Sequence, residues 1–246
     1  MVGPRSGRYS AANKRAVVLL VGPSLPTPPV STISEALAIL SASEADWLTV
    51  HCGTTRTPFS GRSVVDLARR WAFALRAAGV RPGDRVLVLL PNDERFVASF
   101  FGIILAGAVP VPLPWPLSDA GSALLNLAPR IAHADARAAV TVPELADRAP
   151  ISMPCVTSPD RLALLDDMGQ YSTSTAFIQY TSGSLGNPRG AVISQRAAIA
   201  SAQGMATALG LGAGDVAVTW LPLFHDMGLV GFCLAPMMGQ VSVDYI

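Results

Sequence analysis

The stretch YTSGSLGNPRG, residues 180–190, decides the fold of this chain. It contains three glycines, and four hydroxyl side chains fill most of its first five positions. Glycine permits positive φ angles and close backbone approach, so successive amide groups can converge on one anion. Thr181, Ser182 and Ser184 add hydroxyl donors, and Arg189 adds a fixed positive charge that suits phosphate oxygens. The stretch predicts a loop that holds a polyphosphate; the alternative is an ordinary Gly- and Ser-rich surface turn.

Three familiar patterns do not fit this stretch. A Walker P-loop needs G-x-x-x-x-G-K-[ST], and both the spacing and the lysine are missing. The Rossmann pattern G-x-G-x-x-G is absent as well. A nucleophile elbow needs G-x-S-x-G, but Ser182 stands where the first glycine would precede Ser184. A serine hydrolase using Ser184, His225 and an acid is also disfavoured because the adjacent His225 and Asp226 should diverge if their segment is extended.

A fourth pattern does fit. The stretch resembles the signature Y-T-S-G-[ST]-T-G-x-P-K-G of the adenylate-forming superfamily, which includes acyl-CoA synthetases and nonribosomal adenylation domains. It departs at Leu185, where threonine is usual, and at Arg189, where lysine is usual. In that superfamily the loop grips the β- and γ-phosphates of ATP. The resemblance therefore implies phosphate binding by Thr181, Ser182, Gly183, Ser184, Leu185, Gly186 and Arg189.

The two departures bear on activity. Leu185 lacks the hydroxyl of the usual threonine, which removes one donor to phosphate. Arg189 keeps the positive charge of the usual lysine without its compact ammonium group. We therefore expect the fold of the superfamily with a weakened phosphate loop.

A second motif, WLPLFHDMGLVG at residues 220–231, narrows the resemblance. Acyl-CoA synthetases usually carry P-[LM]-F-H followed by a short apolar segment. The form W-L-P-L-[FY]-H-D-M-G-L is instead typical of fatty acyl-AMP ligases, which make acyl-adenylates for polyketide or nonribosomal synthases. The resemblance implies that His225 is catalytic. It also implies an acyl-adenylate pocket formed by His225, Asp226, Met227 and Gly228.

The position of this motif supports a site on independent grounds. His225 and Asp226 come just after a predicted parallel strand, and open α/β sheets bind ligands beyond the carboxyl ends of their strands. Gly228 and Gly231 permit close approach of a partner. The alternative interpretation is a strand-to-helix turn in which Asp226 caps the helix, and both interpretations can hold together.

The resemblance implies an activity with defined partners. A fatty acid carboxylate attacks the α-phosphate of ATP, acyl-AMP and pyrophosphate form, and the acyl group passes to the phosphopantetheine of an acyl carrier protein. ATP and Mg²⁺ are the implied cofactors, and the magnesium ligand is expected downstream of this chain. Two alternatives stay open. One is a fragment of an acyl-CoA synthetase, and the other is a catalytically inactive, truncated binding or remnant protein.

Several parts of the superfamily are not found in the 246 residues. They are the adenine-binding aromatic segment, the acidic residue for magnesium, the ribose-binding aspartate and the C-terminal lysine. The sequence resembles the N-terminal part of the adenylate-forming large domain, so we expect a partial domain over residues 31–246, truncated at its C-terminus. Because catalysis of this kind depends on charges that converge on the phosphates, we expect the chain alone to be inactive.

Outward from the loop, the pattern is that of an α/β protein with layered, mainly parallel sheets and flanking helices. Residues 81–117 look like the early superfamily region that builds a parallel sheet. The glycine-rich loop should join two strands at a sheet edge. The expected strands are 86–90, 109–113, 138–142, 176–180, 190–193 and 216–220, and the chain ends in the strand-like residues 241–246.

Four helices are expected, one before the first of these strands and three between them. Ser63 and Ser194 are candidate N-caps, because a serine oxygen can accept a hydrogen bond from the first turn. Pro129 should kink or split the third helix. The expected helices run from Ser63 to Gly79, from PND at 91–93 to Gly107, across 123–133, and from Ser194 to about Leu209.

Composition excludes several classes of protein. The chain is 50% hydrophobic and 14% charged with a net charge of +1, which argues against disorder and against a nucleic-acid partner. Cys52, Cys155 and Cys233 form no C-x-x-C pair, so we expect no disulfide framework, no metal site and a cytoplasmic location. No apolar run approaches the roughly 18 residues of a spanning helix, so no integral membrane segment is expected.

The two ends of the chain carry separate expectations. Residues 1–30 are rich in Gly, Pro and Ser without a period and are interpreted as a flexible leader. The basic pair at 14–15 and the apolar run 16–21 resemble a secretory signal only faintly, because the run is short and prolines follow at once. At the other end, an unpaired apolar sheet edge after Val241 should cause poor solubility or self-association.

Overall fold

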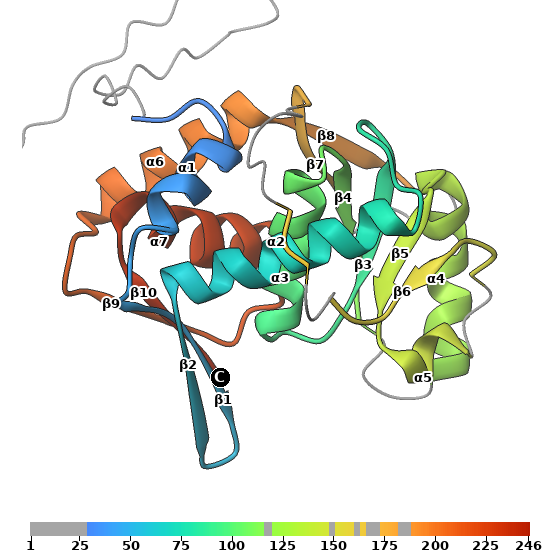
Figure 1. The fold of residues 1–246 in the computed structure, drawn as a ribbon, viewed down its shortest axis with the longest axis horizontal. Coiled ribbons are helices and arrows are strands. Elements are labelled where there is room, and N and C mark those ends of the chain that lie inside the picture. The colour runs from blue at the N-terminus through green and yellow to red at the C-terminus, as the bar shows by residue number, and fades with distance from the viewer. Residues whose placement is uncertain (1–28, 116–119, 148–150, 160–162, 166–172, 182–187) are drawn as a thin grey trace, which may run out of the picture.

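A computed structural model describes residues 29–115, 120–147, 151–159, 163–165, 173–181 and 188–246 (Figure 1). The predicted leader therefore lies almost wholly outside the described residues. The helices are α1 Ile33–Leu40, α2 Gly61–Ala77, α3 Glu94–Leu105, α4 Ala120–Ala134, α5 Pro143–Ala146, α6 Gln195–Leu209, the π-helix η1 Met227–Leu234, and α7 Ala235–Gly239. The strands are β1 Asp46–Cys52, β2 Thr55–Ser60, β3 Arg85–Leu89, β4 Val109–Pro112, β5 Ala138–Thr141, β6 Cys155–Val156, β7 Thr175–Tyr180, β8 Gly190–Ser194, β9 Val216–Thr219 and β10 Ser242–Tyr245.

These strands form three sheets. Sheet A has the order β2-β1-β10-β9 and is parallel except for the β1–β2 hairpin. Sheet B has the order β4-β3-β5-β6 and is parallel throughout. Sheet C is the antiparallel pair β7–β8. The predicted α/β fold with mainly parallel sheets and flanking helices is confirmed.

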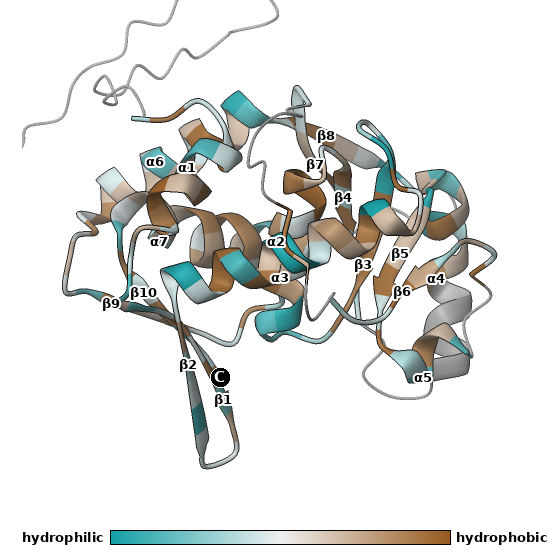
Figure 2. Ribbon diagram, viewed as in Figure 1, coloured by the Kyte–Doolittle hydropathy of each residue, from teal (hydrophilic) through white to brown (hydrophobic). Residues whose placement is uncertain are grey.

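Sheet B supplies the centre of the core. Every residue from Val86 to Leu90 and every residue of β5 is buried, as expected for parallel strands covered on both faces. Figure 2 shows β3 and β5 in hydrophobic colour along their lengths, whereas the β1–β2 hairpin is largely pale or hydrophilic. The edge strand β4 contains Pro110 and Pro112, which cannot donate ladder hydrogen bonds and so suit an edge. β7 lies beside it.

Helix α2 begins earlier than the sequence suggested. Its N-cap is Ser60, whose Oγ accepts a hydrogen bond from the Ser63 amide at 3.1 Å, so the prediction of Ser63 as the cap is wrong. The reason lies in Gly61, where an added Cβ would stand 2.6 Å from the Leu40 carbonyl oxygen. Only glycine fits this close contact, and it lets the chain turn into the helix directly after Ser60.

Helices α2 and α3 pack closely against each other beside sheet B (Figure 1). Asp93 caps α3 by accepting a hydrogen bond from the Arg95 amide at 2.9 Å. Gly102 makes the close packing possible, because an added Cβ would lie 2.6 Å from the Trp71 Cβ and 2.7 Å from the Ala68 carbonyl oxygen. The buried stripe of α2 and the apolar residues of α3 thus form one continuous layer.

Two further helix predictions have different outcomes. Ser194 caps α6 as predicted, and Gly210 ends it in the left-handed conformation. Helix α4, however, is continuous through Pro129, so the predicted split does not occur. A proline inside a helix costs about 3 kcal/mol. Burial of Leu127 and Ile131 on either side of it offsets that cost.

The last strand is not at a sheet edge. β10 pairs in parallel with β1 on one side and with β9 on the other, so the prediction of an unpaired edge after Val241 is wrong. The edges of sheet A are β2 and β9, and in β9 Val216 and Val218 are exposed. Sequence position could not show this, because β1 and β10 are far apart in the chain. Within the described parts of the chain, no helix is long and apolar enough to cross a membrane.

Candidate active site

The glycine-rich loop leaves the end of a hairpin. β7 and β8 pair through Tyr180 and Gly190, and the Thr181 amide donates to the Arg189 carbonyl at 3.2 Å. The two flanking strands are therefore those predicted. Ser182, Gly183, Ser184, Leu185 and Gly186 lie outside the described residues.

The two described loop residues are available to a ligand. Thr181 and Arg189 are both exposed, and the Arg189 side chain has no ion-pair partner in the described part of the chain. The hairpin places them opposite each other at the base of the loop. A hydroxyl donor and a cation in this arrangement suit phosphate oxygens.

Tyr180 anchors the base of the glycine-rich loop to helix α4. Its ring lies over Gly190, where an added Cβ would be 3.5 Å from the ring, and its hydroxyl lies 2.7 Å from His133 Nδ1 on α4. Burial raises the pKa of the Tyr180 hydroxyl, while Arg85 and Arg130 partly offset this rise. The contact connects α4 to the strand that leads into the loop.

The second motif forms a tight turn into a helix. The His225 amide donates to the Pro222 carbonyl at 3.1 Å, and the His225 carbonyl accepts from the Leu229 amide at 2.8 Å. His225 Nδ1 lies 2.6 Å from Asp226 Oδ1, so the expectation that these side chains diverge is wrong. It assumed an extended segment, whereas the chain turns here and starts η1. Both side chains are exposed.

Asp226 also caps the helix, as the alternative interpretation predicted. Its Oδ1 accepts a hydrogen bond from the Met227 amide at 2.7 Å. The helix that follows is a π-helix, a rare form that often occurs at functional sites. The sequence offered no signal for it, because its residues are apolar on all sides.

Gly228 approaches the chain's own backbone. An added Cβ would stand 2.2 Å from the Pro222 carbonyl oxygen, a contact that no side chain tolerates. Gly228 is buried, whereas Met227 before it is 49% exposed. The turn therefore presents His225, Asp226 and Met227 to solvent and uses Gly228 to fold tightly beneath them.

Two side-chain amides hold this turn, and sequence reasoning did not find them. Asn92 Nδ2 donates to the Leu221 carbonyl at 3.1 Å, and Asn92 Oδ1 accepts from the Leu223 amide at 2.7 Å. Gln179 Nε2 donates to the Phe224 carbonyl. Gln179 lies two residues before Thr181, and Phe224 directly precedes His225. The bond therefore joins the strand that leads into the glycine-rich loop to the turn that carries His225.

The described residues do not form a metal centre. No group of three or more His, Cys, Asp or Glu side chains among them could hold an ion. The described cysteines are free, and Cys52, Cys155 and Cys233 lie on separate elements. The described residues thus do not themselves form a magnesium site.

Comparison with known proteins establishes the family. The sequence profile of the AMP-binding enzymes matches residues 41–245, so the chain belongs to this family. The predicted resemblance to adenylate-forming enzymes is thereby confirmed.

Three curated relatives narrow the comparison. The chain is 32% identical to "Putative acyl-CoA synthetase" of Caulobacter vibrioides over 74% of its length. It is 34% identical to the long-chain-fatty-acid--AMP ligase FadD32 of Mycolicibacterium smegmatis over 70% of its length. It is 33% identical to 4-hydroxyphenylalkanoate adenylyltransferase of Mycobacterium tuberculosis over 73% of its length. These alignments cover 33%, 30% and 31% of the relatives, so the chain spans about a third of their length.

Solved structures agree on the fold. A fatty acyl-adenylate ligase from L. pneumophila, in complex with acyl adenylate and pyrophosphate, superposes with a TM-score of 0.75 at 23% identity. The match covers 88% of this chain and 40% of that one. A structure from a study of fatty acyl-adenylate ligases of E. coli and L. pneumophila gives a TM-score of 0.75 at 28% identity, covering 90% and 42% of the two chains.

Proposed function

We propose that this chain is part of a fatty acyl-AMP ligase, an enzyme that activates a fatty acid with ATP. The observation that carries the proposal is the hydrogen bond from Gln179 to the Phe224 carbonyl. It seats the turn with His225 beside the strand that leads into the glycine-rich loop. A phosphate-binding loop and a histidine next to each other suit chemistry at a phosphate.

The reaction balances without a further reactant. A carboxylate oxygen of the fatty acid attacks the α-phosphorus of ATP and forms a new P–O bond. The bond between the α-phosphorus and its bridging oxygen breaks, and pyrophosphate leaves. In a second step the thiol of a carrier protein's phosphopantetheine attacks the acyl carbonyl, the bond between the acyl carbon and the AMP oxygen breaks, and a thioester, AMP and the thiol's proton result.

The loop residues serve the polyphosphate in this proposal. Thr181, Ser182, Ser184 and Arg189 donate hydrogen bonds to the β- and γ-phosphate oxygens, together with the amides of Gly183, Leu185 and Gly186. Charges and donors placed where negative charge gathers on the leaving pyrophosphate lower the barrier. Mg²⁺ bound to ATP would supply further positive charge there, and the described residues offer it no ligand cluster.

His225 and its neighbours face the acyl-adenylate side of the reaction. Both the Asp226 carboxylate and the Met227 amide contact His225 Nδ1, at 2.6 and 3.5 Å. Nε2 is then the ring nitrogen available to the reactants, which is how a carboxylate partner orients a catalytic imidazole. Asp226 and Met227 form the wall of the acyl-adenylate pocket around it, and Gly228 contributes to the pocket by letting the turn fold tightly beneath them.

We infer the substrate and the acceptor from the motif at residues 220–231 and from the names of the relatives. The FadD32 relative is named for a long-chain fatty acid and AMP, and another relative for 4-hydroxyphenylalkanoate. The Caulobacter relative favours the second candidate, an acyl-CoA synthetase. We favour the ligase because WLPLFHDMGL is typical of that group. The reaction would take place in the cytoplasm, where ATP and carrier proteins meet.

The test is product analysis with the protein expressed from its complete gene. With ATP and a fatty acid we expect acyl-AMP and pyrophosphate, and little acyl-CoA after coenzyme A is added. Arg189→Ala should lower the rate by about 10²–10³, and Arg189→Lys should retain most of it. The exposed Arg196 on α6 provides the matched control. Robust acyl-CoA formation would replace the ligase by the synthetase, and no fatty-acid-dependent pyrophosphate would refute both.

Residues 1–246 alone provide a second test. We expect no detectable activity from them, because the described residues offer no metal ligand cluster and the chain spans about a third of its relatives' length. Fatty-acid-dependent pyrophosphate release by these residues, abolished by Arg189→Ala, would contradict this expectation.

A further inference from the structure

We propose that Asn92 and Gln179 are positioning residues for His225. Both hold the backbone immediately before this histidine, Asn92 from the loop between β3 and α3 and Gln179 from β7. The catalytic meaning of this inference rests on the proposed function. The clamp, by which we mean the hydrogen bonds from Asn92 and Gln179 to residues 221–224, is a property of the fold.

The Asn92 side chain can bind the turn because the neighbouring Asp93, and not Asn92, caps helix α3. In the segment PND it is Asp93 whose side chain caps α3. Asn92 instead reaches across to a turn about 130 residues away in the chain, as its bonds to Leu221 and Leu223 show. It uses its donor and its acceptor on alternate residues, as a neighbouring strand would. Both halves of the amide are therefore committed to the turn.

Gln179 is an unusual residue for its place. It lies in β7 and is only 9% exposed, in a strand whose Ala176 and Phe177 are also buried. A buried amide costs stability unless its polar atoms are bonded. Nε2 is bonded to the Phe224 carbonyl, but Oε1 has no hydrogen-bond partner in the described residues. An aliphatic side chain would avoid that cost, so packing alone does not explain a glutamine here.

Together the two amides fix the turn from two sides. They bind the carbonyls of Leu221 and Phe224 and the amide of Leu223, and the His225 amide closes onto Pro222. Since Gln179 precedes Thr181 by two residues, the same contact sets the distance between His225 and the base of the phosphate loop. The residues act through His225 and touch no substrate themselves.

This arrangement predicts a particular kinetic effect. A misplacement of about 1 Å can cost about 10²-fold in rate even when no catalytic group is removed. We expect Asn92→Ala and Gln179→Leu to lower kcat by about 10–100-fold. The KM for ATP should change by no more than about twofold, because the loop that binds the phosphates stays on its hairpin. Loss of stability alone would also lower the apparent kcat at unchanged KM, so kcat is expressed per folded molecule, with the folded fraction measured by circular dichroism.

The matched control is Gln203→Leu. Gln203 is another glutamine with a partnerless buried Oε1 in the described structure, but its Nε2 donates only to Thr207 Oγ1 within α6, at 3.2 Å. The same substitution there changes side-chain chemistry without touching the turn. We expect its kcat to stay within about twofold of the unmodified enzyme. His225→Ala gives the rate that remains when the histidine is absent.

Amide hydrogen exchange tests the clamp without activity. In Asn92→Ala the Leu223 amide loses its acceptor, and one hydrogen bond of about 1 kcal/mol corresponds to about fivefold faster exchange. The Leu229 amide, bonded to the His225 carbonyl, should also exchange faster in both variants. The Leu87 amide in β3 should keep its rate. Asn92→Asp is a milder second variant that retains the acceptor for Leu223 but places a carboxylate against the Leu221 carbonyl.

The outcomes separate the two hypotheses. Faster exchange at Leu223 and Leu229 with a fall in kcat alone supports the proposal. The proposal is overturned if the Leu87 amide exchanges faster by the same factor, or if Gln203→Leu lowers kcat as much as Gln179→Leu does. Either result would mean general destabilisation of the protein. If the complete protein forms no acyl-AMP, the proposed function fails. The clamp is tested separately, and it is refuted if the amide exchange rates of Leu223 and Leu229 do not change in the variants.

Discussion

Strands β5 and β9 have nearly the same sequence, AAVT and VAVT, yet opposite environments. All four residues of β5 are buried, whereas Val216 and Val218 of β9 are 58% and 49% exposed. β5 lies between β3 and β6 inside sheet B, while β9 is one of the two edge strands of sheet A. The burial of such a short strand is thus decided by its neighbours and not by its own residues.

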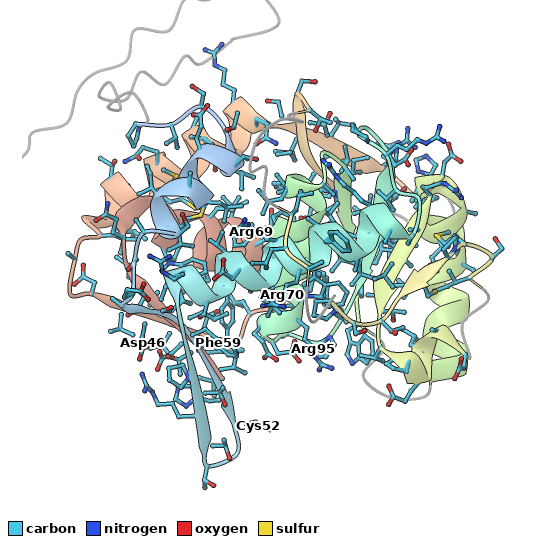
Figure 3. The ribbon with its side chains drawn as sticks, in the orientation of Figure 1. Asp46, Cys52, Phe59, Arg69, Arg70 and Arg95 are labelled. Carbon is cyan, nitrogen blue, oxygen red and sulfur yellow. The ribbon has the colours of Figure 1, made fainter. Side chains whose placement is uncertain are left out.

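The open face of sheet A changes character from strand to strand. Near the hairpin it is polar, with His51 Nε2 2.9 Å from Asp244 Oδ2 and Arg56 bonded to Thr49. Figure 3 shows Cys52 near the tip of this hairpin and Asp46 and Phe59 near its base. Toward β9 the exposed side chains become apolar. Sheet A therefore buries one face, and sheet B buries both.

The largest expected effect comes from one substitution made in both strands. Val140→Asp places a carboxylate at a fully buried position of β5, where an unpaired charge should cost more than about 4 kcal/mol or prevent folding. Val218→Asp places it at an exposed position of β9 and should change stability by less than about 1 kcal/mol. Urea unfolding followed by circular dichroism measures both. Similar losses would mean that the two strands do not differ in burial.

The buried face of sheet A can be probed by pH. Burial raises the pKa of the Cys233 thiol from 9.0 to about 12, and burial also raises the pKa of Tyr245 well above 10. The folded state holds the Cys233 proton after the unfolded state has released it, so stability is complete below pH 9 and falls between pH 9 and about 12. The expected slope is about 1.4 kcal/mol per pH unit.

Two variants isolate the Cys233 contribution. Cys233→Val should flatten the decline in stability between pH 9 and 12 relative to the unmodified chain. Cys52→Val, at the exposed cysteine of the hairpin, should leave the decline as it is. Urea midpoints at several pH values supply the data. An equally steep decline between pH 9 and 10 in Cys233→Val, below the range in which burial of Tyr245 contributes, would show that this thiol is not buried against β10.

A third comparison uses two glycines. Gly102→Ala adds a methyl group where α2 and α3 already touch, and overpacking of this kind costs about 1–3 kcal/mol. Gly212, in the loop before β9, has no atom within 4 Å of an added Cβ and no positive φ. Gly212→Ala should leave stability unchanged or raise it by up to about 1 kcal/mol. Thermal unfolding measures the stability of both variants. If both shifted the midpoint temperature by the same amount, close packing of α2 against α3 at Gly102 would be contradicted.

How far the sequence predicted the fold depends on the range of the interactions involved. The buried strands β3 and β5 and the helix cap at Ser194 follow from local pattern, and the family follows from YTSGSLGNPRG. The β1–β2 hairpin went unpredicted, because β2 has Pro58 and no clear alternation. The place of β10 between β1 and β9 depends on pairing between distant segments.

In the candidate site, too, local features were predicted from the sequence and long-range contacts were not. The motifs located the base of the loop and the turn around His225, since both are short contiguous stretches. Asn92 and Gln179 were missed because each is a single amide whose partner lies far away in sequence. The contact between His225 and Asp226 was predicted wrongly because it depends on the turn, and the turn depends on Gly228 against Pro222.

The smallest expected effect on stability concerns the edge strand itself. Val216→Lys places a charge at an exposed position of β9, and edge strands resist pairing with other chains when they carry lysine. Stability should change by less than about 0.5 kcal/mol, because no buried contact is lost. Self-association of the 246-residue chain should nevertheless fall, which light scattering during size-exclusion chromatography measures. Leu209→Lys is the matched control, since Leu209 is 72% exposed but ends α6 and lies in no strand. If both variants reduce association equally, exposed apolar area and not the free edge of β9 drives it. If neither does, β9 is no site of association, and its contrast with β5 is one of burial alone.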